Sequence, residues 1–481
     1  MSSDKVRMSS LFICVVFLVL GLCSVGGQQP CDHISGNFED WIGSAVSKEV
    51  IIVGGGVAGL NAAKTLLRNG VKDVLVLEAQ DYLGGRVKTY RQGSILVEDG
   101  AEWINGGALN PLYNLAEQLG GLTQPLAVEA YDWRAQTSTG LEADPIGYDA
   151  AADIFVECED DSVLVNYHGT GYGQCYKDRF PGKYDLLRAQ PEEKNAWLNY
   201  LHTWVKKETG FSNWMDQSNR DAVHFTDFGF DEWNQWQDGF DTLISYLLEG
   251  IPQSKISISS PVCKIFWDMD PEGGVLVVTA NGEAYVADYI IVTTSLGHVK
   301  ERHILMFSPQ LPIDYQMTLN KIELGLCDKV QMGWSRPWWG NRPLDLQIIF
   351  TSFDLPEEES WLYGIMEVLS IHQQRNLLQS FVCGDDALLM EQLPEEVVKQ
   401  HFLKHLKQVT GQYIPEPTFF RRSRWGKNIW MRGSYNSYVT VKGDQEGLKS
   451  RTPWPNPSLI PKERRLYSGR ASIRIIGAMV P

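Results

Sequence analysis

The feature that most constrains the fold is a glycine-rich turn at residues 54–59, which reads Gly-Gly-Gly-Val-Ala-Gly. The turn follows a short β-branched run at residues 49–53. It precedes a stretch whose apolar residues recur at helical spacing up to residues 69–70. That order predicts a strand, a helix that begins in the turn, and a stop after one helical segment. A second apolar run at residues 74–77 predicts the next strand of a parallel sheet.

Three glycines of this turn are each required for a different structural reason in a dinucleotide-binding unit. Gly54 allows the tight turn, Gly56 lets a pyrophosphate approach the backbone, and Gly59 lets the helix pack on the strand. Glu78, at the end of the second predicted strand, is placed to accept hydrogen bonds from an adenosine ribose. The combination predicts a dinucleotide cofactor, but it does not distinguish NAD from FAD.

A second glycine pair distinguishes the two cofactors. Gly84, Gly85 and Arg86 follow closely on Glu78. They offer another close backbone approach and a counter-charge, which a longer, pyrophosphate-linked cofactor needs. The sequence therefore favours FAD.

The rest of the chain contains one region of predicted strands and, on either side of it, stretches of mixed and partly helical character. Residues 262–267, 275–280 and 284–293 predict three strands, the last two joined by an Asn-Gly turn that is typical of a tight hairpin. The stretches on either side have mixed character, with predicted helices at residues 192–207 and 395–408.

We therefore expect an α/β fold. A Rossmann-like FAD-binding domain of the GxGxxG type is assembled from discontinuous segments, and an α+β substrate-binding domain accompanies it. The expected segments are a signal peptide (1–27), the first part of the FAD-binding domain (47–130), a helical substrate region (131–250), the second part of the FAD-binding domain (251–300), the substrate-binding domain (301–450) and a truncated carboxyl-terminal FAD-binding segment (451–481).

The amino terminus has the order of a secretory signal peptide. An apolar run at residues 11–25 follows Lys5 and Arg7 and precedes small residues. The run is shorter than the roughly 17 to 25 residues of a membrane-spanning helix. We therefore expect a secreted, soluble protein without an integral membrane span. The formal charge of −16 argues against a nucleic-acid partner and favours a cationic small molecule.

Two residue pairs bear on disulfide and metal chemistry. Cys158 and Cys175 lie in one polar, loop-like stretch, and they either form a local disulfide or stay as free thiols. His401 and His405 are four residues apart on a predicted helix, but no third ligand accompanies them. We interpret both histidines as helix-surface residues and predict no metal site.

Several motifs, taken in order, resemble the FAD-dependent amine oxidases, particularly the polyamine and spermine oxidases. The matching segments are residues 54–59, Glu78, 83–86, 100–104, 236–243, 261–265, 294–297, 327–330 and 433–436. The resemblance implies FAD as the cofactor and hydride transfer to flavin N5 from the carbon next to an amine nitrogen. Water then hydrolyses the iminium to an aldehyde, and O2 reoxidises the flavin and gives H2O2. The implied partners are O2 and a small amine, above all spermine, spermidine or their acetylated forms.

The resemblance also implies roles for single residues. The backbone of Val262 would face the adenine, and Lys329 would hold a water at flavin N5. Tyr435 would be one wall of an aromatic cage, because ring faces attract a cationic amine. Asn105 stands beside the substrate, where polyamine-active relatives usually carry histidine or glutamate. Asparagine can hydrogen-bond an amine but adds no charge. Lys329, Tyr435 and Asn105 are thus the candidate catalytic residues.

The carboxyl-terminal segment departs from the family pattern. Arg470 stands where the family has a glutamate that meets the cofactor, and eleven residues follow it. We expect the flavin end of the site to be incomplete, either in a degenerate paralogue or in a chain whose terminus has been replaced. Two other functions stay open. One is a catalytically impaired member that acts as a binding protein, and the other is an L-amino-acid oxidase, which needs an arginine facing the substrate carboxylate.

Overall fold

The predicted strand-helix-strand unit is present in the computed structural model of the chain. β1 (Val46–Val53) leads through the glycine turn into α3 (Val57–Arg68), and β2 (Val74–Leu77) pairs with β1 in parallel. All of β2 and the end of β1 are buried, as expected of strands covered on both faces. The structure describes residues 30–123, 130–184, 191–222, 233–268, 274–371, 374–435, 437–448 and 472–475.

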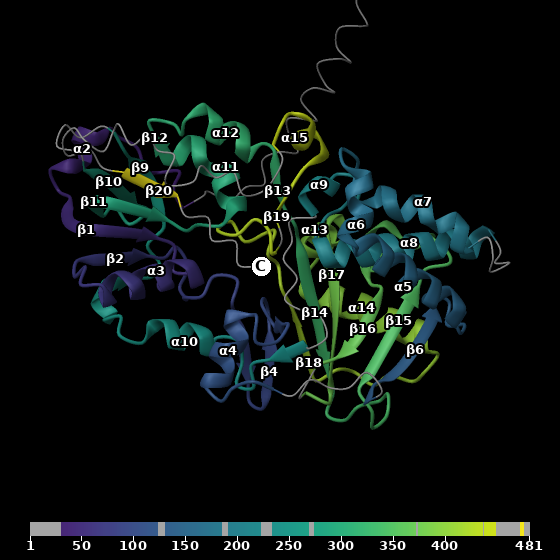
Figure 1. Cartoon of the computed structure of the whole chain (residues 1–481). Helices are drawn as coiled ribbons and strands as arrows, with labels where there is room; N and C mark the ends of the chain where they lie inside the picture. The colour runs from purple at the N-terminus through teal and green to yellow at the C-terminus, as the bar shows by residue number, and fades with distance from the viewer. Residues whose placement is uncertain are drawn as a thin grey trace, which may run out of the picture.

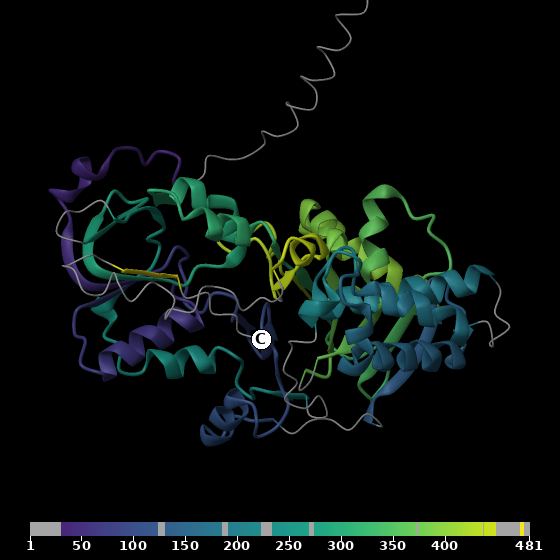
Figure 2. The ribbon, with the colours of Figure 1, turned by 45° about the horizontal axis from the view of Figure 1, so that its top comes forward.

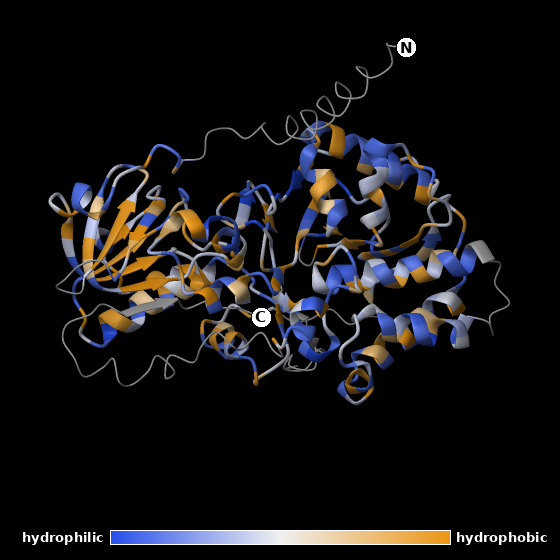
Figure 3. Ribbon diagram, turned by 90° about the horizontal axis from the view of Figure 1, so that it is seen from above, coloured by the Kyte–Doolittle hydropathy of each residue, from blue (hydrophilic) through white to orange (hydrophobic). Residues whose placement is uncertain are grey.

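The sheet that contains this unit has eight strands. Its order is β12-β9-β10-β11-β1-β2-β8, and β20 pairs with β11 beside this path. The other strands are β8 (Ile256–Ser257), β9 (Val262–Phe266), β10 (Val275–Thr279), β11 (Ala284–Val292), β12 (Phe307–Ser308) and β20 (Ser472–Ile475). β9, β10 and β11 match the three strands predicted from sequence, and Figure 3 shows their apolar colouring. Because segments far apart in the chain complete one sheet around β1, the predicted Rossmann-like fold class is confirmed.

Two layers of helices complete the first lobe. α3 packs against α10 (Thr242–Leu248), with Leu60, Leu243 and Leu247 in one apolar cluster. α11 (Leu296–Met306) contacts β9, and α12 (Ile313–Leu319) follows it. Other elements of this lobe are α2 (Phe38–Ile42), β3 (Thr89–Gln92), β4 (Ile95–Glu98), β5 (Trp103–Asn105), α4 (Pro111–Gln118), β7 (Trp233–Gln235) and the 3-10 helix η3 (Gln253–Lys255).

A second lobe lies beside the first (Figures 1 and 2), and the segment with α15 (Val441–Gln445) lies between them. Its sheet has the order β18-β14-β17-β16-β15-β6. The strands are β6 (Asp132–Thr137), β14 (Cys327–Gly333), β15 (Leu344–Ile349), β16 (Glu367–Ser370), β17 (Leu377–Cys383) and β18 (Phe419–Arg422).

Helices lie on both faces of this second sheet. One face packs on α13 (Asp385–Gln392) and α14 (Glu395–Thr410) through a large apolar core. At the β15 and β6 end, the other face packs on α5 (Pro145–Glu159), α7 (Gly173–Tyr184) and α8 (Pro191–Thr209). Toward β14 and β17, that second face contacts the first lobe through polar side chains, because Lys329, Gln331 and Gln379 bond to Glu98 and Glu102. The predicted domain boundaries stay a prediction.

Three disulfides join the six cysteines of the described residues. The pairs are Cys31–Cys263, Cys158–Cys175 and Cys327–Cys383. The alternative of two free thiols at Cys158 and Cys175 is therefore wrong in this structure, and so is their expected place in a loop. Both lie on buried helix faces, in α5 and α7, because the surrounding aromatic residues draw that stretch into an apolar core.

The structure describes neither end of the chain fully. The predicted signal segment and Arg470 lie outside the described residues. Within the part that is described, no helix is both long and apolar enough to cross a bilayer.

His405 corrects the surface interpretation of the two histidines. On α14 it shares the helix face of Phe402, Leu406 and Val409, so helical spacing carries it into the core, where it is 3% exposed. Its ring stacks on Phe350 with centroids 5.3 Å apart. Among the described residues its Nε2 has no hydrogen-bond partner. Burial lowers the pKa of His405 to about 4.

We expect His405→Phe to remove a pH-dependent loss of stability. The unfolded chain takes up this proton near pH 6.5, whereas the folded chain does so only near pH 4. Neutral His405 therefore contributes fully to the free energy of unfolding above about pH 6.5. As pH falls toward 4 this contribution is lost, by about 3 kcal/mol in all. Denaturant unfolding of both proteins between these pH values measures it. Exposed His168→Gln is the control, and parallel curves for wild type and His405→Phe would contradict the prediction.

Candidate active site

The turn between β1 and α3 is shaped by glycines. Gly54 has a φ of +108°, a conformation that favours glycine. A Cβ on Gly59 would lie 1.9 Å from the carbonyl oxygen of Gly54, so α3 can approach the turn only without a side chain there. A Cβ on Gly56 would meet only the Gly84 oxygen, at 3.9 Å, which leaves this side of the turn open. Gly56 is also the N-cap of α3, where backbone N–H groups favour a phosphate.

Glu78 lies directly under this turn and is 4% exposed. Its carboxylate accepts hydrogen bonds from the backbone N–H of Gly55 (2.6 Å) and of Gln80 (2.8 Å). Burial raises the pKa of Glu78, and these two hydrogen bonds counteract the rise. Ser260 donates its N–H to the carbonyl of Glu78 (2.8 Å), and Val262 follows two residues later. Val262, the first residue of β9, thus lies two residues along the chain from a direct backbone contact with Glu78.

The second glycine pair lies against the first. Gly56 and Gly84 form a parallel bridge, and the Gly84 N–H donates to the carbonyl of Gly55 (2.9 Å). Gly84 and Gly85 have φ values of +115° and +62°, so both adopt conformations that favour glycine. The two glycine motifs thus form one continuous backbone surface.

Arg86 completes this surface with a positive charge. Its Nη1 donates to the carbonyl of Ser434 (2.6 Å), and no described carboxylate pairs with it. Burial lowers the pKa of Arg86. A largely enclosed guanidinium without an anionic partner fits a pyrophosphate. The open side of Gly56, the N-terminus of α3 and Arg86 together fit FAD.

We expect Arg86→Met to weaken FAD binding roughly 10- to 100-fold, because charge-assisted hydrogen bonds contribute about 1.5 to 3 kcal/mol. Fluorescence titration of FAD into flavin-free protein measures the affinity. Arg68→Met, at the exposed end of α3, is the control. Equal affinity of Arg86→Met and wild type would show that Arg86 does not meet the pyrophosphate.

Lys329 occupies the middle of β14 and is 4% exposed, so it is not a surface lysine at a strand end. Its ammonium donates to the carbonyl of Gly100 (2.8 Å) and to the carboxylate of Glu102 (2.6 Å). The ring centroids of Trp103 and Phe381 lie 5.4 and 5.5 Å from Nζ. Lys329 is therefore held in a buried slot with two aromatic walls.

Sequence reasoning missed the polar network around this lysine. Gln379 donates to Glu102 (2.9 Å) and accepts from Gln331 (2.7 Å), which also donates to the backbone carbonyl of Glu98 (3.0 Å). Burial raises the pKa of Glu98 to about 7, although the N–H of Phe240 lowers it. Perturbed carboxyl groups of this kind mark candidate sites. The alternation of polar residues along β14 was the signal that could have found them.

Tyr435 lies next to the start of β14, in a segment that contacts Gly325 and Cys327. Ser434 accepts a hydrogen bond from the N–H of Cys327 (2.6 Å), which fixes the segment that carries Tyr435. Residue Tyr435 as a whole is 37% exposed, and its hydroxyl donates to the carbonyl of Lys207. Arg86 donates to the carbonyl of Ser434, and Tyr435 is the next residue, so the two residues lie close together. This placement is consistent with a cofactor bound near Arg86 and a substrate bound next to Tyr435.

Asn105 lies at the end of β5, two residues after Trp103. Its side chain is exposed, and its backbone carbonyl accepts a hydrogen bond from Asn110 (2.8 Å). The described hydrogen bonds connect Asn105 to neither Lys329 nor Tyr435. The catalytic roles of Lys329, Tyr435 and Asn105 stay predictions.

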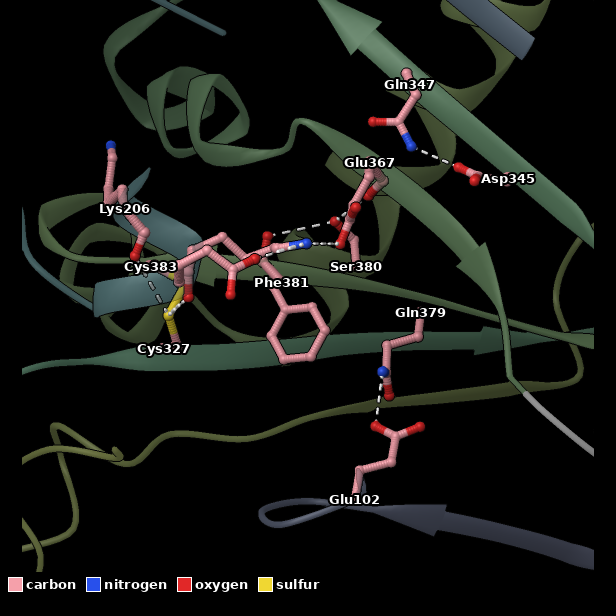
Figure 4. A network of polar contacts seen from close by, with 12 residues as sticks. Glu102, Lys206, Cys327, Asp345, Gln347, Glu367, Gln379, Ser380, Phe381 and Cys383 are labelled. Carbon is pink, nitrogen blue, oxygen red and sulfur yellow. Dashed lines mark hydrogen bonds and ion pairs between the residues drawn. A yellow bond between two sulfur atoms is a disulfide. The ribbon is translucent and has the colours of Figure 1, made fainter. Parts of the chain in front are cut away.

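Carboxylates continue along the polar face of the second sheet (Figure 4). Glu367 on β16 is 6% exposed and pairs with Lys207 (3.0 Å). Asp345 on β15 accepts a hydrogen bond from Gln347. Burial raises the pKa of Asp345 to about 6, against that hydrogen bond, which lowers it. The face that carries Lys329 therefore also carries two acidic side chains, of which Glu367 is paired with Lys207.

Comparisons with known proteins agree with this geometry. The family model of the flavin containing amine oxidoreductases matches residues 57–142 and 180–467. The peroxisomal N(1)-acetyl-spermine/spermidine oxidase of Bos taurus is 25% identical over 466 residues, which cover 88% of this chain and 90% of the relative. The probable polyamine oxidase 5 of Arabidopsis thaliana is 25% identical over 476 residues, which cover 84% and 87%.

A solved structure supports the fold. Wild-type putrescine oxidase bound to putrescine matches with a TM-score of 0.60 at 20% identity, and the match covers 84% of this chain and 90% of that one. The family model spans more than half of the chain, and its cofactor agrees with the FAD predicted from the glycine motifs. The chain belongs to the family of flavin containing amine oxidoreductases, with FAD as its cofactor.

Proposed function

We propose that this flavin amine oxidase acts on polyamines, with O2 as the electron acceptor and H2O2 and an aldehyde as products. The observation that carries the proposal is the slot of Lys329 between Trp103 and Phe381, on the sheet face that also carries Glu367 and Asp345. Aromatic rings and carboxylates both attract an extended cation. The named relatives from Bos taurus and Arabidopsis thaliana are oxidases of such amines by their printed names.

The chain's residues have distinct parts in this proposal. FAD, when bound, accepts the hydride from the carbon next to the amine nitrogen. Lys329 donates a hydrogen bond to a water at the flavin edge, and Tyr435 orients the amine at its ring face. Asp345, which no described salt bridge includes, attracts a distal ammonium group, whereas Glu367 is already paired with Lys207.

The polar face favours an amine over an amino acid. An amino-acid oxidase needs an arginine free to bind the substrate carboxylate. Arg421, which is in register with Gln331 on this face, is paired with Asp99, and its guanidinium lies 3.8 Å from the Tyr90 ring centroid. Arg421 is therefore not free to bind a substrate carboxylate.

Anaerobic titration of the purified protein tests the proposal. The flavin absorption is recorded while spermine, N-acetylated spermine or an L-amino acid is added. Bleaching by a polyamine supports the proposal and ranks the substrates, whereas bleaching by the amino acid alone overturns it. A folded protein that stays colourless after incubation with FAD would overturn the oxidase activity itself.

We also propose that the protein enters the secretory pathway. The three disulfides support this, because such bonds persist in oxidising compartments. Amino-terminal sequencing of protein secreted from expressing cells, with peptide mapping under non-reducing conditions, tests both parts. Retention inside the cell with an intact amino terminus and free thiols would overturn the proposal.

A further inference from the structure

The ion pair between Lys329 and Glu102 is the most enclosed pair of opposite charges in the candidate site. Nζ and Oε2 are 2.6 Å apart, and the two side chains are 6% and 4% exposed. Removing both charges from water costs several kcal/mol, and the pair offsets this cost only if its geometry is well held and its other hydrogen-bonding atoms are satisfied. A buried pair of this kind therefore fixes the position of each partner.

Glu102 is held more firmly than an ordinary counter-ion. Gln379 on β17 donates to Oε2 (2.9 Å), and Gln235 on β7 donates to Oε1 (3.0 Å). Glu102 itself immediately precedes β5, in the first lobe. Figure 4 shows the contact between Gln379 and Glu102. Lys329 on β14 contacts the same carboxylate, so three strands and both lobes converge on Glu102.

The remaining capacity of the lysine is limited. An ammonium has three N–H donors, and two of them meet Gly100 and Glu102. One N–H is left for a further acceptor such as a water. Trp103 and Phe381 flank Nζ, so the ammonium has little freedom to turn away.

We infer that Glu102 is a positioning residue, which directs the Lys329 ammonium so that its third N–H serves the oxidation of the amine. That this position serves catalysis rests on the proposed function. That Glu102 fixes the position of Lys329 concerns only this chain's own residues and is measurable without the cofactor. Glu102 touches neither the substrate nor the reacting atoms in this role.

Lysine labelling of flavin-free protein tests the structural part. Acetylation of Lys329 is followed by mass spectrometry in wild type, Glu102→Gln and Glu102→Asp. We expect Lys329 to react roughly tenfold faster in Glu102→Gln, because the loss of about 1.4 kcal/mol of coupling frees the amine. Glu102→Asp keeps the charge and restores part of the protection. Glu396→Gln, which removes an exposed partner of Lys399, is the control. Equal protection in Glu102→Gln and wild type overturns the inference.

A double-mutant cycle tests the catalytic part. Glu102→Gln should slow anaerobic flavin reduction by a polyamine roughly tenfold with Lys329 present and leave the rate unchanged in a Lys329→Met background. An equal slowing in both backgrounds would show a general structural role and overturn the inference. If no polyamine reduces the wild-type flavin, the proposed function fails, while the labelling result still decides the position of Lys329.

Stability provides a second readout if Glu102→Gln folds poorly. A lone buried ammonium is strongly destabilising, whereas neutralising both partners is much less so. The inference therefore expects the double variant Glu102→Gln/Lys329→Met to melt at a higher temperature than Glu102→Gln. A double variant that melts at or below the Glu102→Gln temperature overturns it.

Discussion

Gly59→Ala is expected to abolish the retention of FAD and to lower the melting temperature. The new Cβ would lie 1.9 Å from the carbonyl oxygen of Gly54 and 2.9 Å from the hydroxyl of Thr293. Neither neighbour can move away, because Gly54 forms the turn itself and Thr293 donates to the carbonyls of Val53 and Gly54. The start of α3 must shift instead, which costs about 3 kcal/mol and corresponds to roughly 100-fold in affinity.

Flavin absorption of the purified variant and its melting temperature measure this effect. Gly43→Ala is the matched control, because a Cβ there meets nothing within 4 Å and its φ of −66° suits alanine. The control should keep both the flavin and the wild-type melting temperature. A yellow Gly59→Ala protein with wild-type stability would show that the turn is not the cofactor's binding site.

The cofactor half of the site could be predicted from the sequence because its signals are local. The turn at residues 54–59 and Glu78 are separated by one helix, and each glycine is demanded by the backbone around it. A short apolar run followed by apolar residues at helical spacing identifies such a unit without knowledge of the rest of the fold. The hairpin between β10 and β11 was predictable for the same reason.

The part of the site around Lys329 depends on contacts between residues far apart in the chain, which no local sequence pattern predicts. Glu102 and Lys329 are 227 residues apart, and Glu102 and Gln379 are 277 apart. The register of β14 with β17 decides that Lys329 lies opposite Phe381 and that Gln331 lies opposite Gln379. A shift by one residue would turn all of these side chains to the apolar face. The resemblance to amine oxidases identified Lys329, but only the folded sheet identifies its partners.

The same distinction explains the error at Cys158 and Cys175. Their neighbourhood is polar in sequence, which favours a loop. However, α5 and α7 pack together with α8, and the aromatic residues Tyr176 and Trp197 fill the space between these helices. Tertiary packing thus determines the structure of that stretch, and the two cysteines face each other across the helix pair.

Lys329→Met is expected to slow flavin reduction by a polyamine at least roughly 100-fold while FAD stays bound. The substitution removes the ammonium from the slot between Trp103 and Phe381 but touches none of the glycines that line the cofactor turn. The Glu102 carboxylate is left without its counter-ion, so a lower melting temperature accompanies the kinetic effect.

Stopped-flow measurement of flavin reduction under anaerobic conditions separates these two consequences. The rate is compared at a temperature where the variant is fully folded and its flavin absorption equals that of wild type. Lys404→Met, which removes a 61% exposed partner of Glu359, should reduce the flavin at the wild-type rate. If Lys329→Met also reduced it at that rate, the buried ammonium would serve only to join the two lobes through Glu102. The chemistry of the amine would then have to be sought farther along the same sheet face, near Asp345.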